Sequence, residues 1–283
     1  MTPRLKLTEA NYFSPEAEMQ YMGSSQFKSF RRCEAAALAE LRGEWGRKDT
    51  LALRVGSYVD AYFSGELEQY KADHPEMFKK DGTLKAEFVH AHKVAQRLER
   101  DDLARMLLSG RHQVIKTGRI GGVWYKTKSD SLLTAAQVEA ICKRFPQVRE
   151  LVPFGGAMIV DLKYMKDFND IWDEDAGEKV SFAEFWGYDI QGAIYQAIDK
   201  RSAPFVIIAA TKQDEPDIDA MYIPDDDLSY SLSEVEALSP RYDAIKRGEI
   251  EPEGCGKCAY CRSMKRLTGI RHYKKINEQE IVL

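Results

Sequence analysis

The stretch "AMIVDLKYM", residues 157–165, brings an acidic and a basic side chain to the end of an apolar run. Asp161 follows three apolar residues, and Lys163 comes two positions after it. Side chains two apart on a strand point to the same face of a sheet, so we expect this carboxylate and this ammonium to lie side by side. The pattern predicts a core strand over 157–164 whose end opens into a cleft. The alternative is a solvated strand end, because Asp and Lys are common surface residues.

The segments around this strand predict an α/β fold, in which a mixed central sheet is flanked by helices within one domain of residues 1–283. Periodic apolar residues predict helices at 23–43, 50–70, 84–109, 134–151, 181–201 and 231–248. Pro146 should break or kink the fourth of them. Two strands joined by the turn-prone pair Gly121-Gly122 are predicted within 112–132, and further strands at 157–164, 203–211 and 217–224.

The bulk composition is that of a soluble globular protein. Of the 283 residues, 44% are hydrophobic and 30% are charged. The net charge of −4 gives no general attraction for nucleic acid, although a local cleft can still be basic. No apolar run reaches the roughly 18 residues of a membrane span, and the N-terminal segment lacks the apolar core of a secretory signal. We therefore expect a cytoplasmic protein whose five cysteines are thiols or metal ligands.

Two further carboxylates are candidates to meet Asp161. Asp130 ends the strand "YKTKSDSL", and Asp60 lies on a helix one turn after Gly56, which would let another backbone come close. Two or three carboxylates at one point cannot all stay ionised without a cation. Mg²⁺ or Mn²⁺ relieves that repulsion, because hard ions prefer oxygen ligands. Beside such an ion, Lys163 can stabilise a deprotonated water or the charge on a phosphate. Carboxylates, a metal ion and a lysine together therefore indicate phosphodiester hydrolysis.

These residues resemble the PD-(D/E)XK nuclease superfamily, and within it the RecE-like, phage-associated exodeoxyribonucleases and the RecB-type nuclease domains. The resemblance is carried by the cysteines and by "GSYVD" (56–60), "KTKSD" (126–130), "IVDLK" (159–163) and "WGYDIQGAIYQ" (186–196). It implies a restriction-endonuclease-like fold, with Asp130 and Asp161 as metal ligands and Lys163 as the catalytic lysine.

The family's Q-x-x-x-Y motif corresponds to Gln191 and Tyr195, which share a helix face because they are four residues apart. The resemblance implies that they position the lysine or the DNA strand near the metal. The alternative is an amphipathic helix with a buried tyrosine. Trp186 and Tyr188 are assigned to packing.

The sequence departs from the family pattern in two places. RecB- and RecE-type members usually carry a histidine where this chain has Asp60, which can still ligate Mg²⁺ or Mn²⁺. Asp130 and Asp161 are 31 positions apart, whereas a short hairpin commonly joins these strands in the family. We expect the insertion 134–156, which ends in "PFGG", to form a flap beside the cleft that shapes access to a DNA end.

The motif "CGKCAYC" spaces three thiols closely enough to bind one ion or cluster: Cys255, Cys258 and Cys261. Cys33 and Cys142 are the candidates for a fourth ligand. Some relatives that this chain resembles hold a [4Fe–4S] cluster with one cysteine before the nuclease core and three after it, which favours Cys33. Cys142 is expected in the core. Zn²⁺ and unmetallated thiols are the alternatives. A metal here would dock the tail, 250–283, on the first helix.

Other polar residues in the sequence have both a functional and a simpler explanation. Five basic residues are candidates for a local wall that contacts phosphates, with solvated faces as the alternative: Lys28, Arg31, Arg32, Lys126 and Lys128. The five histidines show no metal-binding spacing and are expected at the surface or in the core. The acidic run at 225–227 is expected in a loop and helix cap.

Together these patterns predict a metal-dependent DNA nuclease. The resemblance implies an exodeoxyribonuclease that degrades duplex DNA ends in phage or prophage recombination, encoded by a bacterial host or a phage. Its implied partners are DNA and a strand-annealing recombinase, without a membrane, and related exonucleases often form rings, so a homo-oligomer is a further option. Two rivals stay open: a nucleic-acid-binding module on the same fold whose hydrolysis has decayed, and a structural adaptor stapled by the cysteine-bound metal.

Overall fold

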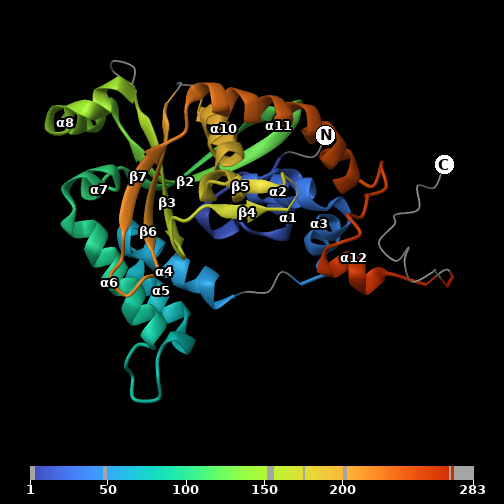
Figure 1. The fold of residues 1–283 in the computed structure, drawn as a ribbon, viewed down its shortest axis with the longest axis horizontal. Coiled ribbons are helices and arrows are strands. Elements are labelled where there is room, and N and C mark those ends of the chain that lie inside the picture. The colour runs from blue at the N-terminus through green and yellow to red at the C-terminus, as the bar shows by residue number, and fades with distance from the viewer. Residues whose placement is uncertain are drawn as a thin grey trace.

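The computed structural model describes residues 4–46, 50–151, 156–174, 176–199, 203–267 and 269–270. Its centre is a five-stranded sheet with the strand order β1-β2-β3-β6-β7 (Figure 1). β3 and β6 are parallel, while the other neighbouring pairs are antiparallel, so the sheet is mixed, as predicted. The strands are β1 (Arg111–Ile120), β2 (Val123–Leu133), β3 (Met158–Met165), β6 (Phe205–Thr211) and β7 (Ile218–Tyr222).

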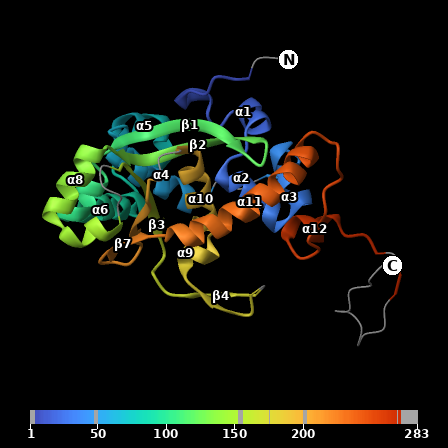
Figure 2. The same ribbon diagram turned by 90° about the horizontal axis from the view of Figure 1, so that it is seen from above.

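Helices cover both faces of this sheet, as Figures 1 and 2 show. Because β3 is buried on both faces, its successive side chains enter two different cores. Ile159 packs in the core beneath the first helical layer, whereas Met158 and Val160 pack in a second core on the opposite face. The first layer consists of α2 (Ser24–Arg32), α3 (Glu34–Leu41), α10 (Tyr188–Asp199) and α11 (Asp225–Lys246), and the second of α4 (Leu51–Ser64), α6 (Ala86–Arg100), α7 (Asp102–Leu107) and α8 (Ala135–Arg144).

Several predicted helices are divided where one or two residues leave the helical conformation. The segment 23–43 separates into α2 and α3 at Cys33, whose φ of −167° and ψ of 108° are extended. The segment 181–201 separates at Gly187, with φ of 63°, into α9 (Phe182–Phe185) and α10. The prediction of one continuous helix is therefore wrong for both segments. The break at Cys33 turns the backbone at a residue that the sequence marked as a ligand.

Other element boundaries also differ from the sequence expectation. Gly65 ends α4 before α5 (Leu67–Asp73), and Asp101 separates α6 from α7 and caps α7 with its side chain. Pro146 ends α8, as predicted, and the 3-10 helix η3 (Pro146–Leu151) follows. α11 begins at Asp225, so the acidic run expected in a loop and cap forms the first turn of this helix.

Several short elements carry too few periodic side chains to be recognised in a sequence. They are η1 (Glu9–Asn11), α1 (Pro15–Gln20), η2 (Pro75–Met77), the hairpin of β4 (Ile171–Asp173) and β5 (Glu178–Val180), and α12 (Ala259–Met264). Within the insertion expected as a flap, residues 152–155 lie outside the described residues, as do residues 271–283 of the tail. Among the described helices, none is both long and apolar enough to cross a membrane.

Gly192 brings α10 close to the sheet. A β-carbon at this position would lie 2.7 Å from Cδ1 of Phe205 and 2.8 Å from Cδ2 of Leu228. Gly192→Ala should therefore push α10 away from β6 and α11, and lower the free energy of unfolding by about 1–3 kcal/mol. Urea denaturation of the variant and the wild type measures this loss.

Gly56→Ala is the matched control, because Gly56 also lies inside a helix. A β-carbon there would meet no described atom beyond its own helix within 4 Å, so the close backbone approach expected at this glycine is not found. Helix propensity alone predicts that Gly56→Ala stabilises the protein by up to about 1 kcal/mol. A Gly192→Ala variant as stable as the wild type would show that α10 can shift without loss of packing.

Candidate active site

Two acidic residues lie where neighbouring strands of the sheet separate. The last pair of the ladder between β2 and β3 is Ser131 with Val160. Asp130 and Asp161 occupy the next position in the same register, where the two strands are no longer paired. Beyond that point β2 pairs instead with the N-terminal segment around Met22. Oδ2 of Asp130 accepts a hydrogen bond from the backbone N–H of Leu162 at 2.9 Å, across the opening between the strands. Strand register thus brings together two carboxylates that are far apart in the sequence.

Lys163 lies beside Asp161 and forms an ion pair with it. Asp161 is only 3% exposed, and the Lys163 ammonium also lies 5.0 Å from the centre of the Tyr188 ring. Burial opposes the charge on Lys163, but Asp161 and Asp130 outweigh that effect and hold the pKa of Lys163 above its ordinary value. The amine therefore stays charged at neutral pH.

α10 lies across the opening between the two strands. Gln191 donates from Nε2 to Oδ1 of Asp161 on β3 at 2.6 Å. Tyr195, one turn later, donates from its hydroxyl to the backbone oxygen of Lys128 on β2 at 3.0 Å. Each residue of the Q-x-x-x-Y pair therefore holds one strand, and Gln191 reaches the carboxylate that is paired with the lysine.

A cleft with a volume of about 520 Å³ opens beside these residues. Asp60 reaches it from α4. Burial raises the pKa of Asp60 to about 7; Asp161 adds to that rise, and Lys163 opposes it. Burial, followed by the charges of Asp161 and Asp60, also raises the pKa of Asp130. The carboxyl groups of Asp60, Asp130 and Asp161 therefore lie close enough to disfavour one another's ionisation. Its polar lining includes Asp60, Asp130, Lys163, Gln191 and Tyr195.

The oxygen donors at this point fit a hard divalent cation. Oδ2 of Asp161 is buried and, among the described residues, meets the ammonium of Lys163 but no hydrogen-bond donor in suitable alignment. A cation would give this oxygen a partner and would lower the pKa of the neighbouring carboxyls. The carboxylate oxygens of Asp60, Asp130 and Asp161 do not all lie within 4.8 Å of one another. Mg²⁺ usually keeps several waters as ligands, so a set with this spacing still fits it.

The raised pKa of Asp60 predicts how divalent cations affect stability at different pH. Burial raises the pKa of this carboxyl in the folded protein to about 7, compared with its ordinary value of 3.8. The folded state binds more protons between these values, so the free energy of unfolding falls as the pH rises through this window. Mg²⁺ or Mn²⁺ should offset that loss. The rise in Tm on adding the cation should be larger at about pH 8 than at about pH 5.

Thermal unfolding with Mn²⁺ and with a chelator, at both pH values, measures this effect. Asp60→Asn removes the titrating group and should reduce the difference between the two pH values. An equal rise in Tm at both pH values in the wild type would contradict the prediction.

Three residues that line the cleft were not predicted from the sequence: Tyr12, Phe13 and Gln113. The register of β1 and β2 would pair Gln113 with Asp130, but the ladder skips this position, where Gln113 has a φ of 51°. Residues other than glycine rarely adopt this left-handed conformation, and Asn, Asp and His are the exceptions a sequence would signal. Tyr12 and Phe13 lie between η1 and α1, which are too short to be recognised.

The basic residues expected to contact phosphates lie in different surroundings. Lys126 and Lys128 both line the cleft, but Lys126 is only 2% exposed. Arg31 forms an ion pair with α11 at 2.6 Å, and Lys28 donates to the backbone oxygen of Trp186 at 3.0 Å. Of these lysines, Lys128 therefore presents the most accessible ammonium to the cleft.

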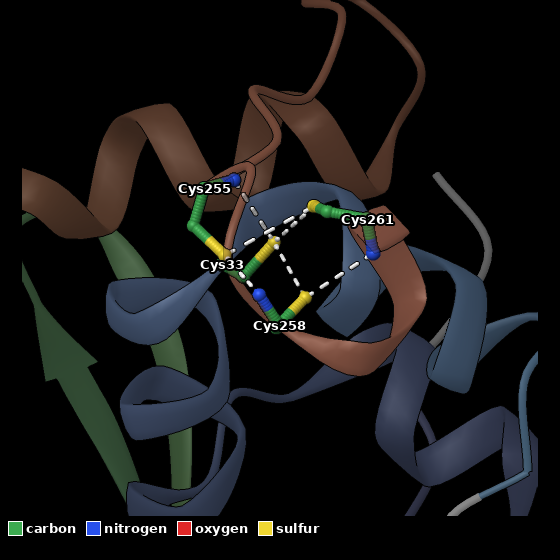
Figure 3. Close-up of side chains that lie close together, drawn as sticks. All are labelled: Cys33, Cys255, Cys258 and Cys261. Atoms are coloured by element: carbon green, nitrogen blue, oxygen red, sulfur yellow. Dashed lines mark hydrogen bonds between the residues drawn. The ribbon is translucent and has the colours of Figure 1, made fainter. Parts of the chain in front are cut away.

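Four cysteines lie together where the C-terminal tail meets the break between α2 and α3 (Figure 3). Sγ of Cys33 lies 3.6 Å from Sγ of Cys261 and 3.8 Å from Sγ of Cys258. Sγ of Cys255 lies 4.0 Å from Sγ of Cys261. Cys142 is buried in the second core, away from this group. The four thiols could bind a metal, with Cys33 as the fourth ligand.

The same part of the tail is also held by charged groups. Arg241 on α11 donates to both carboxylate oxygens of Glu34, at 2.7 and 2.9 Å, and to Glu253 at 2.8 Å. The backbone N–H of Ala35 donates to the backbone oxygen of Glu253 at 3.0 Å. The first turn of α3 therefore contacts the tail next to the cysteines.

Comparison with known proteins places the chain in a family. It matches the family described as "PDDEXK-like domain of unknown function (DUF3799)" over residues 23–141 and 154–264. A crystal structure named "Putative exonuclease", from Eubacterium rectale, is 37% identical with a TM-score of 0.81, and the match covers 97% of this chain and 99% of that one.

A second solved structure, SSO0001, is 12% identical with a TM-score of 0.28, over 84% of this chain and 91% of that one, which is too distant to support an inference. No curated protein matches the chain significantly. The family match and the 37% identity agree with the mixed sheet and its flanking helices. The chain therefore belongs to the family of PDDEXK-like domains, within the PD-(D/E)XK nuclease superfamily.

Proposed function

We propose that this protein is a metal-dependent deoxyribonuclease that hydrolyses phosphodiester bonds. The observation that carries this proposal is the position of Asp130 and Asp161 where β2 and β3 separate, with Lys163 paired to Asp161 beside an acidic cleft. The family match supports a nuclease fold.

The side chains of the cleft have separate roles in this reaction. Asp60, Asp130 and Asp161 would hold Mg²⁺ or Mn²⁺, which when bound supplies Lewis-acid activation of a water and neutralises charge on the phosphate. Lys163 donates to a phosphate oxygen or to the attacking water and stabilises the negative charge that develops. Gln191 keeps Asp161 in orientation through its 2.6 Å hydrogen bond.

We further propose that the enzyme is an exodeoxyribonuclease acting at DNA ends. The name of the Eubacterium rectale structure supports this choice, because that protein shares 37% identity over nearly the whole chain. The resemblance to RecE-like proteins supports a role in phage or prophage recombination, with a strand-annealing recombinase as partner. In this proposal residues 1–283 act as one nuclease domain in the bacterial cytoplasm.

Digestion of linear duplex DNA labelled at one end, beside a covalently closed circle of the same sequence, tests this proposal. With Mg²⁺ or Mn²⁺ we expect progressive loss of the linear DNA from its ends and an intact circle. A chelator should stop the reaction. Cutting of the circle would show that the enzyme is an endonuclease and not an exonuclease. Failure to cut either DNA would overturn the nuclease proposal.

Two observations favour a second candidate, a nucleic-acid-binding module without hydrolysis. Asp60 replaces the histidine usual in the resembling nucleases, and the three carboxylates are not closely gathered. Such a module would bind labelled DNA and leave it uncut in Mn²⁺. Calorimetric titration of Mn²⁺ into the wild type and Asp161→Ala distinguishes a nuclease or a DNA-binding module from a structural adaptor. A structural adaptor would show no cation binding at these carboxylates.

For the cysteine cluster we propose one Zn²⁺ ion in preference to a [4Fe–4S] cluster. Four thiolates at about 2.3 Å from one tetrahedral Zn²⁺ lie about 3.8 Å apart. The sulfur separations of 3.6, 3.8 and 4.0 Å agree with this geometry, and all four sulfurs lie within 4.8 Å of one another. In a [4Fe–4S] cluster each thiolate binds a different iron, so the cluster itself holds the sulfurs farther apart.

Metal analysis of protein purified without oxygen tests this assignment. We expect a colourless protein with about one zinc per chain. Iron and acid-labile sulfide in equal amounts, with a broad visible absorption, would show that the cluster is iron–sulfur.

A further inference from the structure

An exposed aromatic side chain stands at the same cleft as the acidic residues. Phe13 is 72% exposed, whereas its neighbour Tyr12 is only 7% exposed. Both residues line the cleft together with Asp130 and Lys163. Because most of the Phe13 ring is in solvent at the edge of the cleft, it is available to a ligand that enters the cleft.

The backbone that carries this ring is fixed by buried contacts. The ammonium of Lys126, which is 2% exposed, donates to the backbone oxygen of Tyr12 and pairs with Glu18 at 2.7 Å. The rings of Tyr12 and Phe13 meet edge to face, with their centres 4.8 Å apart. On the other side, Ser14 accepts a hydrogen bond from the first turn of α1. The Phe13 ring is therefore presented on a rigid support.

A cation stands next to the ring. The ammonium of Lys128 lies 5.4 Å from the centre of the Phe13 ring. Its ion pair with Glu9 is long, at 3.9 Å, so this ammonium keeps donor capacity for an anion. The backbone of Lys128 is held by Tyr195 at 3.0 Å. An aromatic face beside a cation is the arrangement with which proteins bind the base and the phosphate of single-stranded nucleic acid.

The size of the cleft indicates how much of a substrate it holds. Its volume of about 520 Å³ lies within the range of pockets that bind one small molecule, so the part of a DNA substrate inside it is about one or two nucleotides of one strand. We propose that Phe13 is a stacking platform for a base of a single DNA strand, and that Lys128 contacts a neighbouring phosphate. This inference rests on the proposed nuclease function and specifies the substrate at the cleft as an unpaired strand end.

Binding of a single-stranded oligonucleotide with 2-aminopurine as a terminal base tests the platform. The titration uses the full chain with a chelator present, so that the strand is not cut, and each end of the oligonucleotide is labelled in turn. Stacking on Phe13 should quench the fluorescence in the wild type for one end. Phe13→Ala should abolish that quenching and weaken binding about tenfold, whereas Phe13→Tyr should retain both.

Two further variants separate stacking from simple burial and from charge. Phe13→Leu keeps an apolar contact with Tyr12 but has no aromatic face, so it should lose the quenching as Phe13→Ala does. Lys128→Met should weaken binding and reduce the slope of log K against log salt by about 0.7, the value for one phosphate contact on a single strand. Tyr230→Ala removes another exposed aromatic side chain, 81% exposed on α11, and should change neither binding nor quenching.

The results distinguish failure of the platform from failure of the nuclease proposal. If Phe13→Ala and Phe13→Leu bind and quench like the wild type, the platform is wrong, even where the wild type digests DNA with Mn²⁺. If the wild type digests no DNA but both variants lose quenching, the platform stands and the nuclease proposal falls. Thermal unfolding should show that both variants fold like the wild type, because the Phe13 side chain is mostly in solvent.

Discussion

Asp161→Asn should lower the rate of DNA cleavage by about a thousandfold while leaving the protein folded. The asparagine keeps an oxygen for the hydrogen bond from Gln191, which is 2.6 Å in the wild type, but it has no charge with which to bind a cation. It also removes the ion-pair partner of Lys163. Release of labelled nucleotides from linear duplex DNA, with Mg²⁺ or Mn²⁺ in excess, measures the loss.

Asp226→Asn is the control for this prediction, because Asp226 is an exposed acidic residue in the first turn of α11. It should digest DNA at the rate of the wild type. The midpoint of thermal unfolding shows whether Asp161→Asn is folded. A folded Asp161→Asn protein that still cleaves within tenfold of the wild type would mean that this carboxylate does not hold the catalytic cation.

Cys258→Ala should release the cysteine-bound metal and lower Tm by about 10 °C. The proposed metal would join Cys33, between the first two helices of the first layer, to three cysteines near the other end of the described chain. A structural Zn²⁺ contributes its binding energy to folding, and a loss of about 3–4 kcal/mol corresponds to a shift of this size in a chain of more than 200 residues. Metal content and calorimetry of the same preparation measure both effects.

Cys142→Ala is the matched control, since it removes a buried thiol that packs in the second core. It should keep the full metal content and lose only the stability of a small core side chain. If Cys258→Ala unfolds at the same temperature as the wild type, the ion pairs of Arg241 with Glu34 and Glu253 are sufficient to hold the tail.

Local patterns allowed part of the fold and of the site to be predicted. An apolar run with a polar end identified the central strand, observed as β3, Met158–Met165, because strand formation and burial leave a signature within a few residues. The period of two then placed Asp161 and Lys163 on one face, and the structure shows them as an ion pair. The spacing of the last three cysteines is also a local pattern, because the motif is short and α12 begins within it.

The rest depended on contacts between distant segments. Asp130 meets Asp161 because of the register in which the β2–β3 ladder ends, and no spacing within one sequence specifies a register across 31 positions. Cys33 is extended although neither a glycine nor a proline stands beside it, so tertiary contacts override a helical pattern. Gln113 likewise adopts a left-handed backbone that a glutamine rarely takes, so its own conformational preference does not predict it.

The two hydrogen bonds of α10 have a mechanical consequence. Gln191 and Tyr195 are separated by one helical turn, about 6 Å of rise, and each is bonded to a different strand. The helix therefore fixes the separation of β2 and β3 beside the site, and widening that opening would break at least one of the two bonds. In the proposed nuclease, discrimination against a thicker substrate would then come from this rigid element and would not require a moving loop.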